Sequence, residues 1–154
     1  MIPVQRLNHA VLYVRDADQA SAFYHVVFGF EVVAAMPGRA AFLKAAGSDN
    51  DHDLGLFTIG ADASGPIPGT VGLYHLAWQV GSIRDLATAR TELQARGAYV
   101  GESDHGTTKS IYGRDPDGNE FEIMWLVPAE GVDATERPGM VAPLDLDREI
   151  ARFG

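Results

Sequence analysis

Residues 7–14 read LNHAVLYV and residues 73–80 read LYHLAWQV, and these two similar stretches decide the fold. Both alternate between apolar and other residues as a strand with one buried face does. Each has a histidine at its third position, His9 in the first stretch and His75 in the second. The matching pattern indicates that the chain contains an internal repeat.

The same succession of elements is predicted after each stretch. In the first copy, Asp16 caps a helix from Ala17 to Val27, and Gly29 ends it. In the second copy, Ser82 caps a helix from Ile83 to Arg96. The remaining strands are predicted at residues 30–35, 40–45 and 53–59 of the first copy, and at 98–102, 110–114 and 121–126 of the second.

These elements predict an α+β fold of two βαβββ modules, at about residues 5–60 and 72–127. A module of about 60 residues cannot bury a large core alone, so we expect the two to pair into a cupped, barrel-like mixed sheet. Residues 1–127 then form one domain, with a Gly- and Pro-rich loop at residues 60–70. Residues 128–154 form an irregular C-terminal tail with a short helix at 144–153, which packs on its own domain or on a partner subunit.

Composition excludes several classes of function. The 154 residues are 46% hydrophobic and 21% charged, with a net charge of −9, and no basic stripe suits nucleic acid. The absence of cysteine excludes disulfides, thiolate zinc sites and a cysteine nucleophile. No apolar stretch approaches the roughly 20 residues that span a membrane, and the N-terminus lacks a signal-peptide pattern. We therefore expect a cytoplasmic protein.

Pairing of the modules is expected to bring His9 and His75 together at the floor of the cup. Glu122 lies in the last strand, between Phe121 and Ile123, which should face the helix side and so direct Glu122 into the cup. Two imidazoles and one carboxylate form a three-point site for a divalent metal and leave about three of six positions open. Open positions are typical of a catalytic metal, so His9, His75 and Glu122 are the predicted metal ligands.

The two modules, this ligand set and the closing sequence DPDGN at residues 115–119 resemble the vicinal oxygen chelate superfamily, over roughly residues 5–127. That superfamily includes glyoxalase I, fosfomycin and bleomycin resistance proteins, and extradiol ring-cleaving dioxygenases. Two further motifs, HDLGLF at residues 52–57 and HGTTKSIY at 105–112, are most similar to catechol 2,3-dioxygenase-like enzymes.

This resemblance implies an extradiol dioxygenase that cleaves a catechol-type ring with O2. The implied cofactor is Fe(II), with Mn(II) as the alternative, and the implied substrates are a small aromatic diol and O2. His52 is implied as the acid/base residue, because histidine titrates near neutral pH. His105 and Tyr112 are implied to orient the substrate.

Two alternatives stay open. One is another metal-dependent enzyme on this scaffold, a glyoxalase-like lyase or an antibiotic-modifying transferase. Glyoxalase-like members take a fourth ligand, usually glutamate, from the fourth strand, and residues 53–59 contain none. The other alternative is a non-catalytic binding protein of the bleomycin resistance type, which does not need the metal triad.

Three further expectations concern neighbours of the site. Asp53 is expected to orient the imidazole of His52, and Lys109 is expected to be a solvated strand lysine. Extradiol enzymes commonly contain two such domains, so in this chain the tail or another subunit must shield the site. Because paired modules leave apolar sheet edges and the tail is long, we also expect a homodimer or a higher homo-oligomer.

Overall fold

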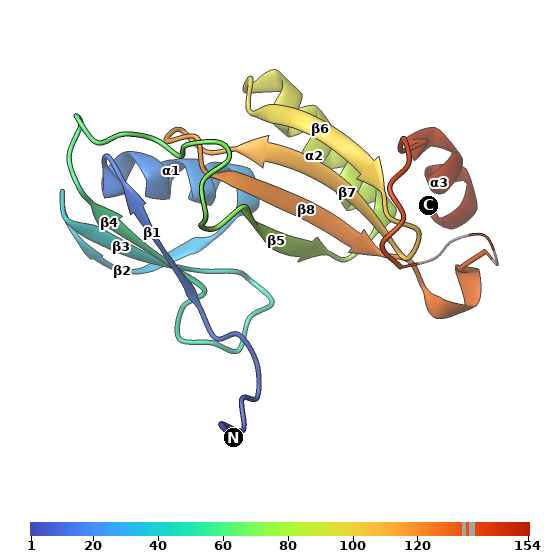
Figure 1. The fold of residues 1–154 in the computed structure, drawn as a ribbon, viewed down its shortest axis with the longest axis horizontal. Helices are drawn as coiled ribbons and strands as arrows, with labels where there is room; N and C mark the ends of the chain where they lie inside the picture. The colour runs from blue at the N-terminus through green and yellow to red at the C-terminus, as the bar shows by residue number, and fades with distance from the viewer. Residues whose placement is uncertain (134, 136–137) are drawn as a thin grey trace. The chain divides into compact units, whose positions relative to one another are not determined.

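A computed structural model describes residues 1–133, 135 and 138–154. It contains two four-stranded mixed sheets with helices packed on them, so the predicted α+β class is confirmed. The chain divides into two compact units, residues 1–66 and residues 67–154, and each holds one predicted βαβββ module (Figure 1). The C-terminal tail belongs to the second unit. The pairing of the two sheets into one cup stays a prediction.

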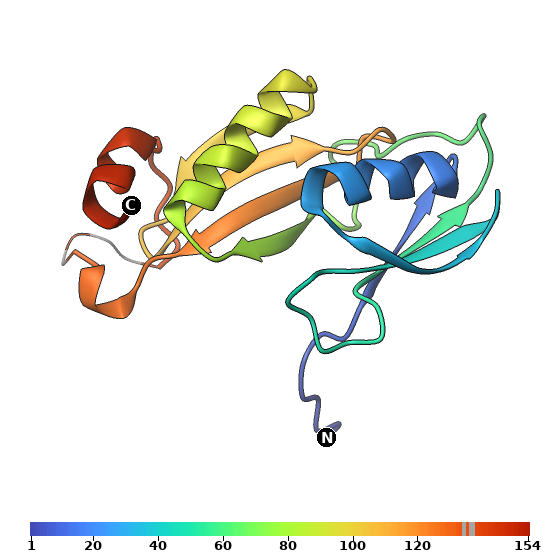
Figure 2. The same cartoon turned by 180° about the vertical axis from the view of Figure 1, so that it is seen from behind.

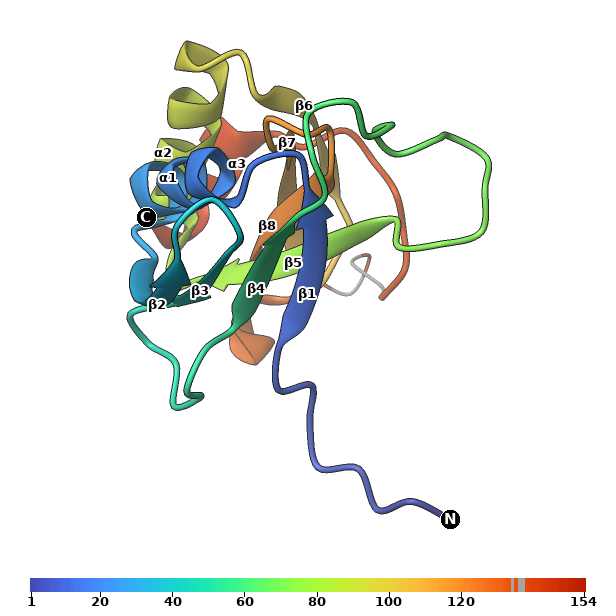
Figure 3. The same cartoon turned by 90° about the vertical axis from the view of Figure 1, so that its left-hand side faces the viewer.

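The first unit contains β1 (Ala10–Val14), α1 (Ala17–Phe28), β2 (Glu31–Met36), β3 (Ala40–Lys44) and β4 (Leu54–Thr58). The strand order is β1-β4-β3-β2, with β1 and β4 parallel and lying side by side in Figure 3. The helix α1 packs chiefly on β3 and β4. Its predicted ends are confirmed, since Asp16 accepts hydrogen bonds from two backbone N–H groups and Gly29 adopts the left-handed conformation with a φ of 68°.

The second unit contains β5 (His75–Val80), α2 (Ile83–Ala95), β6 (Tyr99–Asp104), β7 (Thr108–Arg114) and β8 (Glu120–Leu126). Its strand order, β5-β8-β7-β6, repeats that of the first unit, and β5 and β8 are parallel. The helix α2 lies across one face of this sheet, as Figure 2 shows. Ser82 caps the helix as predicted, by accepting a hydrogen bond from the backbone N–H of Asp85.

The internal repeat extends to the irregularities of the two sheets. The register between β2 and β3 shifts between Val32 and Ala34, and that between β6 and β7 shifts between Tyr99 and Gly101. Each shift is a β-bulge at the same place in its module. The pairings also show which residues are equivalent: Val11 lies opposite Gly55 in the first unit, as Ala77 lies opposite Glu122 in the second.

Several strands begin at other residues than the sequence pattern predicts. The strands predicted at residues 7–14 and 73–80 begin at Ala10 and His75, so His9 lies just before β1. The strand β1 begins at Ala10 because this is the first residue that pairs with β4, opposite Leu54. Conversely, β7 begins at Thr108 because this residue pairs with Leu126 at the end of β8.

Each sheet has an apolar face under its helix. In the first unit, Leu54 and Leu56 are fully buried. In the second, Phe121 and Ile123 are only 1% and 4% exposed. The strand alternation therefore places Glu122 on the opposite face, as predicted.

The tail forms the short helix that was predicted and packs on the second unit. A 3-10 turn, Ala129–Gly131, precedes α3 (Leu146–Phe153), which packs against α2. The ring of Phe153 lies 5.1 Å from the ring of Trp125 in β8. Among the described residues, no helix is both long enough and apolar enough to cross a bilayer.

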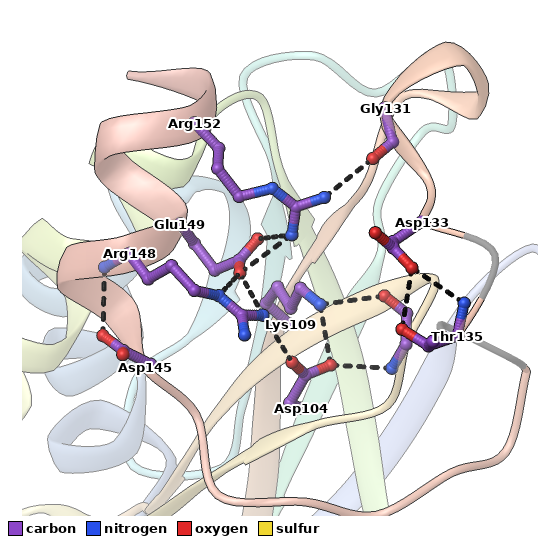
Figure 4. A network of polar contacts seen from close by, with 10 residues as sticks. Asp104, Lys109, Gly131, Asp133, Thr135, Asp145, Arg148, Glu149 and Arg152 are labelled. Atoms are coloured by element: carbon purple, nitrogen blue, oxygen red, sulfur yellow. Dashed lines mark hydrogen bonds and ion pairs between the residues drawn. The ribbon is translucent and has the colours of Figure 1, made fainter.

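The expectation of a solvated Lys109 is wrong. This side chain is fully buried, and its Nζ lies 2.7 Å from Oδ1 of Asp104 and 3.0 Å from the carbonyl oxygen of Gly106 (Figure 4). Alternation along β7 directs Lys109 to the apolar side of the sheet, where the tail packs. Burial of an ammonium group requires a partner such as Asp104.

Candidate metal and substrate site

Two predicted metal ligands of the second unit converge. Nε2 of His75 lies 3.1 Å from Oε2 of Glu122, with side chains that are 24% and 13% exposed. The other ring nitrogen of His75, Nδ1, is buried and has no hydrogen-bond partner among the described residues. Nε2 of His75 and Oε2 of Glu122 are the kinds of donor atom that a divalent transition metal binds.

Tyr112 and His105 extend this group along the same face. The hydroxyl of Tyr112 lies 3.4 Å from Oε1 of Glu122, and its ring lies 5.7 Å from that of His75. Nε2 of His105 lies 2.7 Å from the same hydroxyl. The four predicted site residues of the second unit therefore form one contiguous group from His105 to His75.

The position of Tyr112 keeps its hydroxyl protonated. Desolvation by burial, and then the negative charge of Glu122, raise the pKa of Tyr112 from 10 to about 12. Both causes disfavour the phenolate. At neutral pH Tyr112 is therefore a hydrogen-bond donor and acceptor without charge.

The two predicted site residues of the first unit also lie together. The rings of His9 and His52 have centroids 4.5 Å apart, and Phe42 packs edge-on against His52 at 5.2 Å. Nδ1 of His9 lies 2.8 Å from Oδ1 of Asn8, which accepts a hydrogen bond, so in the neutral ring Nε2 carries no proton. His9 is exposed and His52 is half-buried.

The residue beside His52 that was expected to orient it does not do so. The carboxylate of Asp53 instead accepts hydrogen bonds from Ser48, Ala45 and Asn50 within the turn before β4. Burial alone would raise the pKa of Asp53, but these hydrogen bonds outweigh it and lower the value.

Asp51 takes the place that was expected for Asp53. Its Oδ2 lies 3.2 Å from Nδ1 of His52. Hydrogen bonds from His52, first from its backbone and then from its side chain, lower the pKa of Asp51. The carboxylate next to the imidazole therefore precedes His52 in the sequence and does not follow it.

The two modules differ chemically at equivalent positions. Tyr112 and Glu122 pair across β7 and β8, and the equivalent pair in the first unit is Phe42 and Gly55. The first module therefore has a ring without a hydroxyl and no carboxylate at these places. Sequence reasoning did not identify this asymmetry, because it appears only when the strand registers are compared.

The six predicted site residues thus fall into two groups, His9 with His52 and the four of the second unit. Within either unit, the described residues include no set of three or more His, Cys, Asp and Glu side chains placed to hold one ion. The set of His9, His75 and Glu122 draws on both units, so it stays a prediction.

One contact of the site has no signal in the sequence. Nδ1 of His105 lies 2.9 Å from the backbone carbonyl oxygen of Met140, in the C-terminal tail. Any residue type can supply a backbone carbonyl, so no motif marks Met140 as a neighbour of the site.

Comparisons with known proteins agree with this architecture. Residues 6–123 match the model of the Glyoxalase/Bleomycin resistance protein/Dioxygenase superfamily. The chain is 32% identical over 138 residues to biphenyl-2,3-diol 1,2-dioxygenase 3 of Rhodococcus globerulus, covering 86% of this chain and 71% of that protein. It is 28% identical to the manganese-dependent 2,3-dihydroxybiphenyl 1,2-dioxygenase of Geobacillus genomosp. 3, covering 80% of this chain but only 38% of that longer protein.

Among solved structures, lactoylglutathione lyase from Agrobacterium tumefaciens is 31% identical with a TM-score of 0.62, covering 80% of this chain and 96% of that one. The match to the family model spans most of the chain. The chain therefore belongs to the glyoxalase/bleomycin resistance/dioxygenase superfamily.

Proposed function

We propose that the chain is a metal-dependent extradiol dioxygenase that cleaves a catechol-type ring with O2. The observation that carries this proposal is the chain of His105, Tyr112, Glu122 and His75 on one face of the second sheet. It combines two metal-ligand types with two hydrogen-bonding groups that suit a diol. Relatives named as dioxygenases of biphenyl diols support the same reaction.

We propose His9, His75 and Glu122 as the ligands of Fe(II), with Mn(II) as the alternative that one manganese-dependent relative supports. The convergence of His75 and Glu122 at 3.1 Å fits this donor set. His9 occupies the same place in the first module as His75 in the second. When bound, such an ion would supply adjacent positions for the two oxygens of a diol and for O2.

The protein groups around this centre have separate roles in the proposal. His52 accepts a proton from the substrate, and the carboxylate of Asp51 lies beside its Nδ1. Tyr112 hydrogen-bonds an oxygen of the diol, because burial keeps this side chain uncharged. His105 orients Tyr112 through the 2.7 Å contact.

The glyoxalase-like lyase is the second candidate, because a lactoylglutathione lyase is 31% identical. The fourth strand argues against it. Gly55 stands where Glu122 stands in the second module, and the neighbouring Leu54 and Leu56 are fully buried on the other face. The face that carries the site therefore has no fourth carboxylate ligand on β4.

The test is an aerobic assay of the chain loaded with Fe(II) or Mn(II) against a panel of catechols and biphenyl-2,3-diol. We expect O2 uptake together with the yellow ring-opened product. His75→Ala should abolish both, and His25→Ala, which changes an exposed histidine of α1, should abolish neither. Metal-loaded protein that consumes no O2 with any diol but isomerises a thiol adduct of a 2-oxoaldehyde would establish the lyase instead.

We also propose that the chain forms a homodimer or a higher homo-oligomer. All six residues of β2, EVVAAM, are exposed although this edge strand is largely apolar. Exposed apolar edges favour association with another chain. A mass measured by sedimentation or light scattering that equals one chain would contradict this assembly.

A further inference from the structure

The C-terminal tail contacts the candidate site through the backbone carbonyl of Met140. The oxygen of Met140 lies 2.9 Å from Nδ1 of His105, and Nε2 of the same ring lies 2.7 Å from the hydroxyl of Tyr112. The imidazole therefore bridges the tail and the tyrosine that contacts Glu122.

The chemistry of these contacts decides where the ring proton of His105 lies. A carbonyl oxygen accepts hydrogen bonds and has no proton to donate, so Nδ1 must be the donor to Met140. A neutral imidazole has one N–H, so Nε2 is then an acceptor. The proton between Nε2 and Tyr112 is consequently the hydroxyl proton, which Tyr112 donates to His105.

This order leaves the oxygen of Tyr112 as an acceptor. A phenol has one proton, and the 2.7 Å contact with His105 is much shorter than the 3.4 Å contact with Glu122. With its proton engaged by His105, Tyr112 keeps its lone pairs for a donor such as a substrate hydroxyl.

Backbone pairing immediately next to His105 fixes the position of the carbonyl. The N–H of Asp104 donates to the oxygen of Ala142 at 2.8 Å, and the N–H of Ala142 donates to the oxygen of Asp104 at 2.9 Å. The tail thus pairs with the edge strand β6 through one isolated antiparallel bridge, between Ala142 and Asp104. Met140 lies two residues before this bridge.

Side chains hold the same junction. The carboxylate of Asp104, 7% exposed, lies 2.7 Å from Lys109 and 3.7 Å from Arg148 of α3. Within α3, the fully buried Glu149 pairs with Arg148 and Arg152 (Figure 4). Arg152 also donates to the carbonyl of Gly131 at 2.9 Å. These ionic contacts to two buried carboxylates, Asp104 and Glu149, hold the tail in one arrangement.

We propose that the C-terminal tail is a positioning element of the candidate site. The Met140 carbonyl fixes His105 as the Nδ1–H tautomer, and Nε2 of this tautomer accepts the hydroxyl proton of Tyr112. The tautomer does not depend on any reaction. Only the use of Tyr112 as an acceptor for a diol rests on the proposed function.

The test is a long-range proton–nitrogen NMR correlation on the full chain with nitrogen-labelled histidine, at about pH 8, where an ordinary imidazole is neutral. His105→Gln identifies the signals of His105 by their loss. We expect His105 to show only the Nδ1–H tautomer. A wild-type spectrum with the proton on Nε2 would overturn the proposal.

A variant of the tail tests the cause. Ala142→Pro removes the N–H that bonds to Asp104, and Pro143→Ala is the matched control that leaves both bridge hydrogen bonds in place. We expect Ala142→Pro to lose the exclusive Nδ1–H signal of His105 and Pro143→Ala to keep it. An Ala142→Pro protein whose tail amides have become exchangeable but whose His105 tautomer is unchanged would also overturn the proposal.

The wild-type spectrum decides the question even where Ala142→Pro fails to fold. It needs neither metal nor substrate, so a failed ring-cleavage assay leaves the tautomer assignment intact. Conversely, an NMR result that overturns the tautomer assignment does not affect the dioxygenase proposal, which the ring-cleavage assay tests separately.

Discussion

His75 and Glu122 meet diagonally across two parallel strands. His75 pairs with Glu120 in the register of β5 and β8, yet its Nε2 lies 3.1 Å from Oε2 of Glu122, the next residue along on the same face. Ala77 lies directly opposite Glu122, and its small side chain leaves room for this diagonal contact. The diagonal contact brings this carboxylate and imidazole as close as the proposed metal site requires.

Replacing Glu122 by glutamine should remove metal binding and keep the fold. Glutamine has nearly the same shape but lacks the negative charge that binds a divalent cation. Loss of a residue that only hydrogen-bonds a metal ligand typically lowers metal affinity about 10–100-fold. Loss of the ligand itself should therefore lower the affinity by more than about 100-fold. Calorimetric titration with Mn(II) measures the change. Glu120→Gln, on the same strand, is the control that should keep the affinity within a few-fold.

His9→Ala tests whether the two modules contribute to one site. If His9 completes the ligand set, its loss should weaken Mn(II) binding by a factor like that for Glu122→Gln, although His9 lies in the other unit. His25→Ala changes the other exposed histidine of the first unit and should leave binding unchanged. Equal affinities of His9→Ala and wild-type protein would show that the second unit binds the ion without His9.

The raised pKa of Tyr112 predicts a pH dependence of stability. Between pH 10 and about 12 the folded chain keeps the hydroxyl proton that the unfolded chain releases. The unfolded state then binds fewer protons, so the free energy of unfolding falls as the pH rises through this window. Tyr112→Phe should show a shallower fall. Urea unfolding of the two metal-free proteins at several pH values measures this fall. If the free energy of unfolding fell equally with pH in both, the raised pKa of Tyr112 would be contradicted.

Gly113 lies where no side chain fits. A Cβ there would meet two ring atoms of Phe121 at 2.6 Å and the carbonyl oxygen of Ala98 at 3.1 Å. Gly113→Ala should therefore lower the free energy of unfolding by about 1–3 kcal/mol. Gly101→Ala is the matched control in the neighbouring strand, because its Cβ would meet nothing within 4 Å. Thermal or urea unfolding that does not separate the two variants would refute the close packing.

The buried pair of Lys109 and Asp104 should show strong coupling. Lys109→Met leaves the buried carboxylate of Asp104 with Arg148, at 3.7 Å, as its remaining cation among the described residues, and should cost about 3–5 kcal/mol. Adding Asp104→Asn removes the uncompensated charge and should recover part of that loss. A double-mutant cycle by urea unfolding measures the coupling energy, and strictly additive losses would mean that the pair acts independently.

The sequence was sufficient to predict the helices and the succession of strands along the chain, but not their order within each sheet. Asp16, Gly29 and Ser82 mark helix ends through local hydrogen bonds and backbone conformation, which depend on near neighbours alone. Strand ends were predicted less well, because a strand extends only as far as its partner. His9 lies outside β1 for this reason, although its stretch alternates like a strand.

The parts of the site that sequence reasoning missed depend on long-range packing. Lys109 resembles a surface lysine until the tail covers it, and the position of the tail follows from contacts of Asp104 with residues about 40 positions later. Asp51 and Asp53 flank His52 equally in the sequence, and only the turn before β4 decides which of them contacts the imidazole. Histidines at matching places in the repeat were predictable because the repeat itself is visible.

The glycine at position 55 limits the proposed metal site to one in each chain. The duplicated modules have matching strand orders and matching bulges, but only the second carries a carboxylate at the place that Gly55 holds in the first. An assembly of these chains, whatever its size, therefore offers one such carboxylate for every two modules. Elemental analysis of a fully loaded preparation should accordingly approach one ion per polypeptide and never two.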